Sequence, residues 1–459
     1  MRAMATSTAP PIRAARTRLL LEAPILGTLL RLAAPNLVVM LAQASTGLVE
    51  TAFVGRLGTD ALAGMALVFP GVMLMQMVSG GAMGGGIAAA IARALGAGRR
   101  ADADALVWHA LAINVALALL FMLAGLLGGP ALYRFMGGHG KALEAALLYS
   151  NILFGGALLL WLMNALASCL RGTGNMVVPS AVICVGAVLL VPLSPLLIFG
   201  LGPFPRLGIA GGGVAVLLYY AGGTAVLAWY VRSGRSLVRL QAARLRWAPL
   251  WDILRVGLVA ALVSVQTQII VTAATAFVGR FGTGAIAGYG AGARLEYLLI
   301  PLVFGLGAPL VALIGTNIGA GQRARAVRVA WIGAGVAFVM TEAIGLAAAA
   351  FPAAWLGLFG ADPAMLATGS TYLRLAGPFY GFFGLGMAIY FASQGAGRMA
   401  WPLTAALLRT LIAVGGGWLA LHWTDQPGPV FLALGAGLVT FGVVNALALA
   451  AGAWSGTRA

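Results

Sequence analysis

The sequence predicts an all-α membrane protein with twelve transmembrane helices in two pseudo-symmetric six-helix bundles. Composition, the length of the apolar runs and an internal repeat each support this fold class. Of the 459 residues, 61% are hydrophobic and only 8% are charged, whereas soluble domains carry about 25% charged residues. A surface so poor in charge must face lipid, where only helices and closed barrels satisfy the backbone.

The apolar runs have the length of membrane-spanning helices and show no two-residue alternation, so a β-barrel is excluded. Twelve runs can be counted, at residues 30–54, 61–92, 104–128, 145–169, 177–203, 209–231, 252–278, 285–314, 326–350, 368–393, 402–422 and 428–452. The second and eighth runs exceed the minimum span, which predicts tilt or extension beyond the bilayer. Within the second run, GGAMGGG at 80–86 is a candidate for a bent segment.

Basic residues predict the orientation in the membrane. The chain has 28 Lys and Arg against 11 Asp and Glu. With the N-terminus inside, twenty basic residues fall on the inner side and six on the outer, while Arg294 and Arg409 lie within spans. This bias follows the positive-inside rule. With an even number of spans, it predicts a multi-pass membrane protein with both termini cytoplasmic. No basic patch is interleaved with stacking aromatics, so no nucleic-acid partner is expected.

The longest hydrophilic stretch, RSGRSLVRLQAARLRW at 232–247, lies near mid-chain, where a linker between two halves belongs. The predicted organisation is a cytoplasmic N-terminal arm at 1–29, an N-lobe at 30–231, a cytoplasmic linker at 232–251, a C-lobe at 252–452 and a cytoplasmic tail at 453–459.

The two halves repeat one another. TAFVGRLGTDALAG at 51–64 matches TAFVGRFGTGAIAG at 275–288, with eleven of fourteen residues identical at an offset of 224. LGAGRRADA at 95–103 and LRGTGNMVVP at 170–179 match segments 223 residues later. Six spans per repeat make the repeats parallel. Such duplications are typical of secondary transporters with a site between the halves, although duplication without transport is the alternative.

These motifs also resemble a known family. VETAFVGRLGTDALAG, the GAG turn after the second span and the RGTGN turn after the fourth are similar to segments of multidrug and toxic compound extrusion (MATE) transporters. The resemblance covers essentially the whole chain. It implies a V-shaped transporter that exports cationic or amphipathic drugs and is driven by inward flow of H⁺ or Na⁺.

Three carboxyl groups within spans are candidate functional groups, since each charge costs about 2.5–3.5 kcal/mol in a membrane. Glu50 is the first, and its repeat counterpart is Ala274, so the scaffold does not require an acid there. The resemblance implies that Glu50 binds the coupling ion, because family members usually have Asp at this position. The alternative is a solvated residue near the outer helix end. Asn164 is a further candidate for this N-lobe site.

Glu296 in the eighth span is the candidate coupling residue of the C-lobe. Many family members carry a seventh-span acid, which SVQTQII lacks here. The alternative for Glu296 is an interhelical pair with Arg409. Gln266 and Gln268 are the candidate substrate-cavity residues, together with Glu342. For Glu342, an interhelical hydrogen bond is the alternative.

Two departures from the family pattern bear on the coupling ion. Some relatives have Asp where this chain has Ser194, and others have Asp where it has Phe383. Na⁺ sites need several oxygen ligands, so the scarcity of acids favours H⁺ over Na⁺. No Walker motif, HExxH, catalytic triad or Rossmann fingerprint is present. Neither an enzyme nor a cofactor, metal site or catalytic residue is therefore predicted.

Together with this resemblance, the sequence predicts a monomeric antiporter of the bacterial inner (plasma) membrane. The resemblance implies that it exports organic cations in exchange for H⁺, or less favourably Na⁺, by alternating access in the lipid bilayer. A flippase for lipids or lipid-linked saccharides is the alternative transport function. It is disfavoured because such flippases line their cavity with several arginines, and only Arg294 and Arg409 lie within spans. A membrane-embedded enzyme would need clustered acids or histidines, which the sequence lacks.

Overall fold

A computed structural model describes residues 11–454, and the regular structure in this part of the chain is helical. The N-terminal half contains α1 (Pro11–Glu22), α2 (Ile25–Gly55), α3 (Thr59–Gln76), η1 (Met77–Met83), α4 (Gly84–Gly96), α5 (Arg100–Phe135), α6 (Gly140–Gly155), α7 (Ala157–Gly172), α8 (Val177–Phe199) and α9 (Ile209–Arg232). The C-terminal half contains α10 (Trp247–Gly279), α11 (Thr283–Gly319), α12 (Arg323–Ala350), α13 (Pro352–Leu356), α14 (Pro363–Ala376), η2 (Gly377–Phe379), α15 (Tyr380–Ala396), α16 (Ala400–Thr410), η3 (Leu411–Gly415), α17 (Gly416–Trp423) and α18 (Gly428–Ala450).

The predicted spans are confirmed as helices. Ten helical runs among the described residues are long and apolar enough to cross a membrane. The pair α6 and α7, bent by 46° at their junction, makes an eleventh. Helix α2 supplies the twelfth, with 31 residues that begin in an apolar segment. Each of these twelve spans overlaps one of the twelve predicted apolar runs, because hydrophobicity and helix length are fixed by the same requirement to cross the bilayer.

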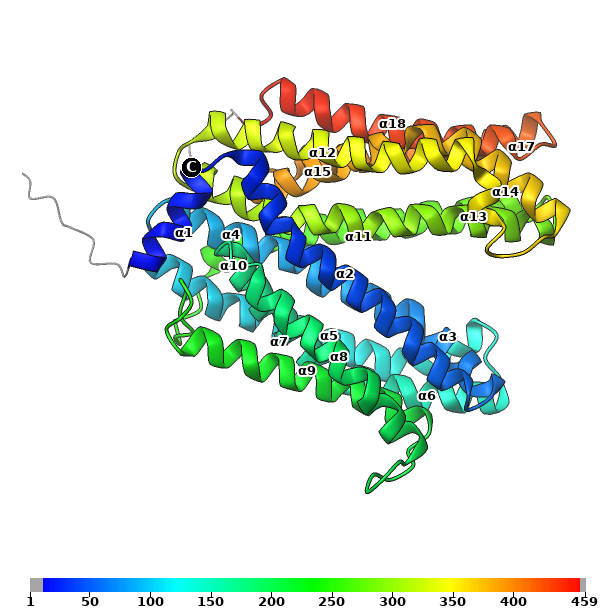
Figure 1. Cartoon of the computed structure of the whole chain (residues 1–459), viewed down its shortest axis with the longest axis horizontal. Helices are drawn as coiled ribbons and strands as arrows, with labels where there is room; N and C mark the ends of the chain where they lie inside the picture. The colour runs from blue at the N-terminus through cyan, green and yellow to red at the C-terminus, as the bar shows by residue number, and fades with distance from the viewer. Residues whose placement is uncertain (1–10, 455–459) are drawn as a thin grey trace, which may run out of the picture.

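The helices form two bundles that lie together at one end of the molecule and diverge toward the other, giving a V (Figure 1). We call these the closed end and the open end. Helix α1, the segment between α9 and α10, and the end of α18 lie at the closed end (Figure 1). Residues 1–10 of the predicted N-terminal arm and 455–459 of the predicted tail lie outside the described residues.

Each bundle has its own hydrophobic core. One core is built mostly from α10–α18 and the other mostly from α3–α9. A few residues cross over at the closed end: Ala88 and Ala89 of α4 belong to the first core, and Ile253 of α10 belongs to the second. The two bundles are therefore packed into one another at the closed end.

Glycines allow this close packing. A Cβ at Gly96 of α4 would lie 2.1 Å from the carbonyl oxygen of Thr316, and one at Gly319 of α11 would lie 2.1 Å from that of Arg93. Gly96 and Gly319 are 223 residues apart, the offset of the repeat. Helices α4 and α11 thus cross in a pseudo-symmetric contact that only small residues permit.

Several spans are interrupted. The π-helix η1 covers residues 77–83, so the segment expected to bend, 80–86, begins in π-helical geometry. Helix α6 gives way to α7 at Gly156, and α14 gives way to α15 through the 3₁₀ turn η2. These two breaks occupy equivalent positions in the two repeats.

The segment between the bundles is attached to the N-terminal one. The backbone N–H of Arg239 donates to the carboxylate of Asp104, and that of Arg246 donates to Nε2 of His109 at 3.0 Å. Helix α10 begins at Trp247. Residues 247–251, which the sequence analysis assigned to the linker, therefore form the first turns of the seventh span.

Candidate functional site

Glu50 lies in the last turns of α2, toward the open end, and is partly buried between neighbouring helices. The phenol of Tyr149 in α6 donates a hydrogen bond of 3.1 Å to Oε1 of Glu50. Tyr149 itself is buried, with 5% of its surface exposed. The carboxyl group is thus held inside the bundle by a fixed donor.

Three consecutive glycines of α9 make room around this carboxyl group. A Cβ at Gly211 would lie 2.5 Å from the backbone of Leu197, and one at Gly213 would lie 3.0 Å from Ile152. A Cβ at Gly212 would lie 3.5 Å from Oε1 of Glu50. Glycine therefore lets α9 approach both α8 and α6, and it leaves the Glu50 carboxyl group against bare backbone.

A second polar group lies deeper in the same bundle. Gln76, the last residue of α3, donates to the hydroxyl of Tyr220 in α9. Nδ2 of Asn164 donates to Oγ of Ser79 in η1 at 2.7 Å. Asn164 therefore bonds the π-helical segment rather than Glu50, with which the sequence analysis grouped it.

The C-terminal bundle holds a different arrangement around Glu296. Tyr372 of α14 donates to Oε2 of Glu296 at 3.1 Å. Nη2 of Arg409 lies 3.4 Å from Oε1, so Glu296 and Arg409 form an ion pair. Arg409 is 7% exposed, and its guanidinium lies 5.7 Å from the ring of Phe383 and 5.6 Å from that of Phe441. Phe383, where some relatives have Asp, thus packs on this arginine.

A small cavity of about 40 Å³ adjoins this ion pair. Thr267, Tyr289, Glu296, Tyr372 and Arg409 contribute its polar lining. Its volume is enough for roughly three or four water molecules, at about 10–15 Å³ each. The Glu296–Arg409 pair therefore lies beside space for water rather than in a dry core.

The three predicted substrate-cavity residues do not line this cavity. Gln266 is buried and its Oε1 has no hydrogen-bond partner, whereas Gln268 on the same helix is exposed. Glu342 of α12 accepts a hydrogen bond of 2.6 Å from the backbone N–H of Gly381. Because Gly381 lies in the first turn of α15, the Glu342 carboxylate caps that helix, where negative charge is favourable.

The two bundles differ in how they treat their carboxyl groups. Among residues 11–454, no ion pair involves Glu50. Glu296 has the cationic partner Arg409. The other intramembrane arginine, Arg294, is exposed and lies 5.0 Å above the ring of Phe359. Of the two glutamates bonded by a tyrosine, Glu50 therefore has no cationic partner and Glu296 has one.

Sequence reasoning missed the tyrosines that hold both acids. Tyr149 and Tyr372 are 223 residues apart, the offset of the repeat. The same position of each repeat thus donates to a carboxyl group, although Glu50 lies on the first span of its bundle and Glu296 on the second. The signal was available, because a position-by-position alignment of the halves pairs the two tyrosines.

A family model described as MatE matches residues 35–196 and 260–419, more than half of the chain and parts of both repeats. The chain belongs to the multidrug and toxic compound extrusion (MATE) family. Family members are membrane transporters, and this chain is accordingly a multi-pass membrane transporter of the multidrug efflux type.

Relatives with curated descriptions agree in length and in part in function. An FAD transporter of Shewanella oneidensis is 29% identical over 379 residues, which is 82% of each chain. A probable multidrug resistance protein NorM of Deinococcus radiodurans is 29% identical over 420 residues, covering 84% of this chain and 88% of that one. This MATE protein therefore resembles relatives described with different cargoes.

Solved structures support the V-shaped fold. A MOP superfamily transporter from Pyrococcus furiosus superposes with a TM-score of 0.86 at 24% identity, covering 96% of this chain and 99% of that one. A multidrug resistance MATE transporter described as outward-facing superposes with a TM-score of 0.83 at 24% identity, covering 94% and 97%. At this identity the likeness establishes the fold alone.

Proposed function

We propose that this MATE protein is a proton-coupled exporter of organic cations and that Glu50 carries the coupling proton. In this proposal the protein acts as a monomer in the bacterial plasma membrane. The closed end and both termini face the cytoplasm, as the distribution of basic residues favours. The open V then faces the outside, and transport alternates between this state and one that is open to the cytoplasm.

One observation carries the assignment of Glu50. Its carboxyl group is partly buried, accepts one hydrogen bond from Tyr149 and has no ion-pair partner among the described residues. An uncompensated negative charge in a membrane span costs about 2.5–3.5 kcal/mol. A proton or a cationic substrate removes that cost. The Glu50 carboxyl group therefore favours binding of either a proton or a cationic substrate. This competition between the two is what an exchanger requires.

The exchange cycle follows from this competition. In the outward-open state, a proton from outside neutralises Glu50, so a cationic substrate held by the carboxylate is released. After the lobes rock, the proton leaves to the cytoplasm, and the restored charge attracts the next cation. Each ligand shifts the two-state equilibrium by its different affinity for the two states.

A proton fits this site better than Na⁺. Na⁺ needs several oxygen ligands, preferably including carboxylates. Among residues 11–454, no three His, Cys, Asp or Glu side chains gather as a metal-binding group. A proton needs only the one carboxyl group. Asn164 and Glu296 are weaker candidates than Glu50 for the coupling residue. Proton uptake by Glu296 must break its ion pair with Arg409.

Transport in proteoliposomes tests the proposal. We expect Glu50→Gln to abolish efflux driven by an imposed pH gradient, because glutamine keeps the size of the side chain but binds no proton. Glu144→Gln is the matched control, since Glu144 is an exposed carboxylate on α6 in the same bundle. Wild-type efflux by Glu50→Gln would overturn the assignment. A response to a Na⁺ gradient alone would replace H⁺ by Na⁺.

Export of a flavin nucleotide is the second candidate function, because the Shewanella oneidensis relative is described as an FAD transporter. FAD carries phosphate charges, so its transport would require cationic rather than anionic contacts. The same proteoliposomes, assayed in parallel with a cationic dye and with FAD, separate the two. Export of FAD without dye export would replace organic cations as the substrate class.

A further inference from the structure

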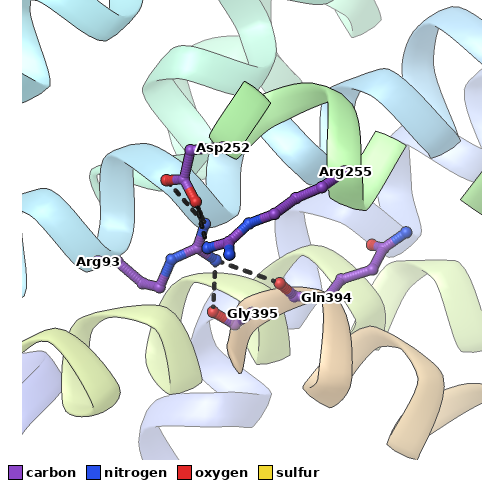
Figure 2. Close-up of polar contacts among 5 residues, drawn as sticks. All are labelled: Arg93, Asp252, Arg255, Gln394 and Gly395. Carbon is purple, nitrogen blue, oxygen red and sulfur yellow. Dashed lines mark hydrogen bonds and ion pairs between the residues drawn. The ribbon is translucent and has the colours of Figure 1, made fainter. Parts of the chain in front are cut away.

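An arginine of the N-terminal bundle reaches into the C-terminal bundle at the closed end (Figure 2). Nη2 of Arg93, on α4, donates to both carboxylate oxygens of Asp252, on α10, at 3.0 Å each. Nη1 donates to the carbonyl oxygen of Gly395 at 3.1 Å and lies 3.5 Å from that of Gln394. One guanidinium thus joins α4 to two helices of the other bundle.

The Arg93 contact is sheltered from solvent. The Arg93 side chain is 11% exposed and that of Asp252 is 30% exposed. Arg255, one turn further along α10, also donates to Asp252 (Figure 2). Charge-assisted hydrogen bonds of this kind are about twice as strong as neutral ones, and partial burial protects the ion pair from screening by salt.

Arg93 also completes the end of a helix. Gln394 and Gly395 lie in the last turn of α15, where carbonyl groups need partners from outside the helix. The Gln394 carbonyl oxygen accepts from the backbone N–H of Gly397, so the main contribution of Arg93 is its hydrogen bond to the Gly395 carbonyl oxygen. Gly397 follows with a φ of +70°, which ends the helix and turns the chain away. A cation is favourable at the C-terminal end of a helix. The guanidinium therefore stabilises α15 only while the two bundles are together.

The repeat shows that this contact is not part of the common scaffold. Arg93 corresponds to Thr316 at the offset of 223, and Asp252 corresponds to Thr28 at the offset of 224. Both threonines donate to carbonyl groups of their own helices instead. The pseudo-symmetric position on the other side of the α4–α11 crossing therefore has no ion pair.

The side chain of Gln394 is packed between the two bundles at this surface. Its side chain is fully buried, and its Oε1 has no hydrogen-bond partner. Oε1 faces Gly85 of the N-terminal bundle, where an added Cβ would lie 2.3 Å away. An unpaired buried acceptor costs free energy. Separation of the bundles would expose it to water, so this cost favours opening, and the Arg93 contacts oppose it.

We propose that Arg93 and Asp252 form an ion-pair latch between the lobes that holds the closed end shut, and that the latch breaks each time the transporter opens to the other side. The latch sets the balance between the two access states and takes no part in binding substrate or protons. It rests on the alternating-access cycle of the proposed function, not on the identity of the cargo or of the coupling ion.

The distance between the open ends of the two bundles tests the latch without any substrate. Spin labels at Lys141→Cys and Asp425→Cys, both exposed at the open end, would be placed in a chain whose Cys169 and Cys184 are replaced by alanine. Wild-type latch residues should give mainly the long distance of the open V. We expect Arg93→Met to raise the ratio of short to long distances at least fivefold.

Three further variants sharpen this comparison. Arg255→Gln is the matched control, because Arg255 pairs with the same carboxylate but lies in the same bundle, and its distances should match wild type. Asp252→Asn removes the ion pair without changing size, and it replaces Arg93→Met if that variant does not elute as a folded monodisperse protein. Arg93→Lys keeps the charge and should shift the ratio less than Arg93→Met.

Unchanged distances in both Arg93→Met and Asp252→Asn would overturn the latch, as would an equal shift in Arg255→Gln. The proposed function fails separately. If distances shift but efflux responds to neither a proton nor a Na⁺ gradient, the latch stands and the coupling proposal falls. If Glu50→Gln abolishes coupling while the distances never change, only the latch falls.

Discussion

Individual side chains decide which of the two tyrosine-bonded glutamates has a cationic partner. Tyr149 and Tyr372 occupy one position of the repeat and each donates to a glutamate, at 3.1 Å in both bundles. Only Glu296 also has a cation, Arg409. The two repeats thus share the tyrosine donor but place the acid on different spans, and only the acid of the C-terminal bundle, Glu296, is in an ion pair.

The two tyrosines should therefore differ in their importance for coupling. Tyr149→Phe removes the donor that stabilises the charged Glu50 carboxylate after its proton has left. A hydrogen bond is worth about 0.5–1.5 kcal/mol, so we expect efflux driven by a pH gradient to slow about 2- to 10-fold. Initial rates in proteoliposomes measure this.

Tyr372→Phe is the matched comparison. Glu296 keeps its pair with Arg409 in this variant, so the efflux rate should change less than in Tyr149→Phe, while the thermal unfolding midpoint falls. Equal loss of efflux in both variants would contradict the distinction between the two carboxyl groups and raise Glu296 to an equal coupling residue.

Helices in this protein approach one another through glycine and change direction at defined breaks. Gly96 and Gly319 let α4 and α11 cross with backbone against backbone. The break at Gly156 and the turn η2 follow the helices that carry Tyr149 and Tyr372. Glycines thus set the distance between α4 and α11 at the closed end. The breaks separate α6, which carries Tyr149, from α7, and α14, which carries Tyr372, from α15.

Alanine at Gly96 should destabilise the protein, because its Cβ would lie 2.1 Å from the Thr316 carbonyl oxygen and backbone cannot move aside cheaply. Overpacking of this kind costs about 1–3 kcal/mol. Gly335→Ala on α12 is the control, since nothing lies within 4 Å of its Cβ and alanine favours a helix by about 0.5–1 kcal/mol. In detergent, the midpoint of thermal unfolding should be lower for Gly96→Ala than for Gly335→Ala and the wild type. Equal midpoints would contradict the close contact at Gly96.

The whole molecule combines a symmetric scaffold with asymmetric charges. The α4–α11 crossing and the two tyrosines follow the repeat. In the alignment of the two halves, however, Glu50 corresponds to Ala274 and Arg93 corresponds to Thr316. A scaffold of two equal lobes can rock about a central axis. In our proposals, the unequal charges determine which state is held shut and which lobe binds the coupling ion.

Orientation in the membrane is a property of the whole chain and can be tested directly. In the background without native cysteines, a membrane-impermeant thiol reagent should label Lys141→Cys and Thr424→Cys in intact cells. It should label Gln241→Cys, in the segment between the bundles, only in inverted vesicles. All three positions are exposed. The opposite pattern would reverse the proposed orientation and direction of transport.

The sequence by itself determined the helices, their number, the duplication and the family. Hydrophobicity, run length and repeat register can be read along one dimension, because the bilayer imposes the length of each span locally. It also singled out Glu50 and Glu296, since an acid in an apolar run is conspicuous wherever the run folds. Comparison of the halves would have found Tyr149 and Tyr372 as well.

Only the tertiary structure decided which groups meet. Tyr149 and Glu50 are 99 residues apart, Glu296 and Arg409 are 113 apart, and Arg93 and Asp252 are 159 apart. Such contacts depend on helix rotation and on crossings set by glycine, which no single span specifies. The sequence therefore identified the charges, and the packing of the two bundles determined that Glu296 is neutralised, that Glu50 is not, and that Arg93 joins the lobes.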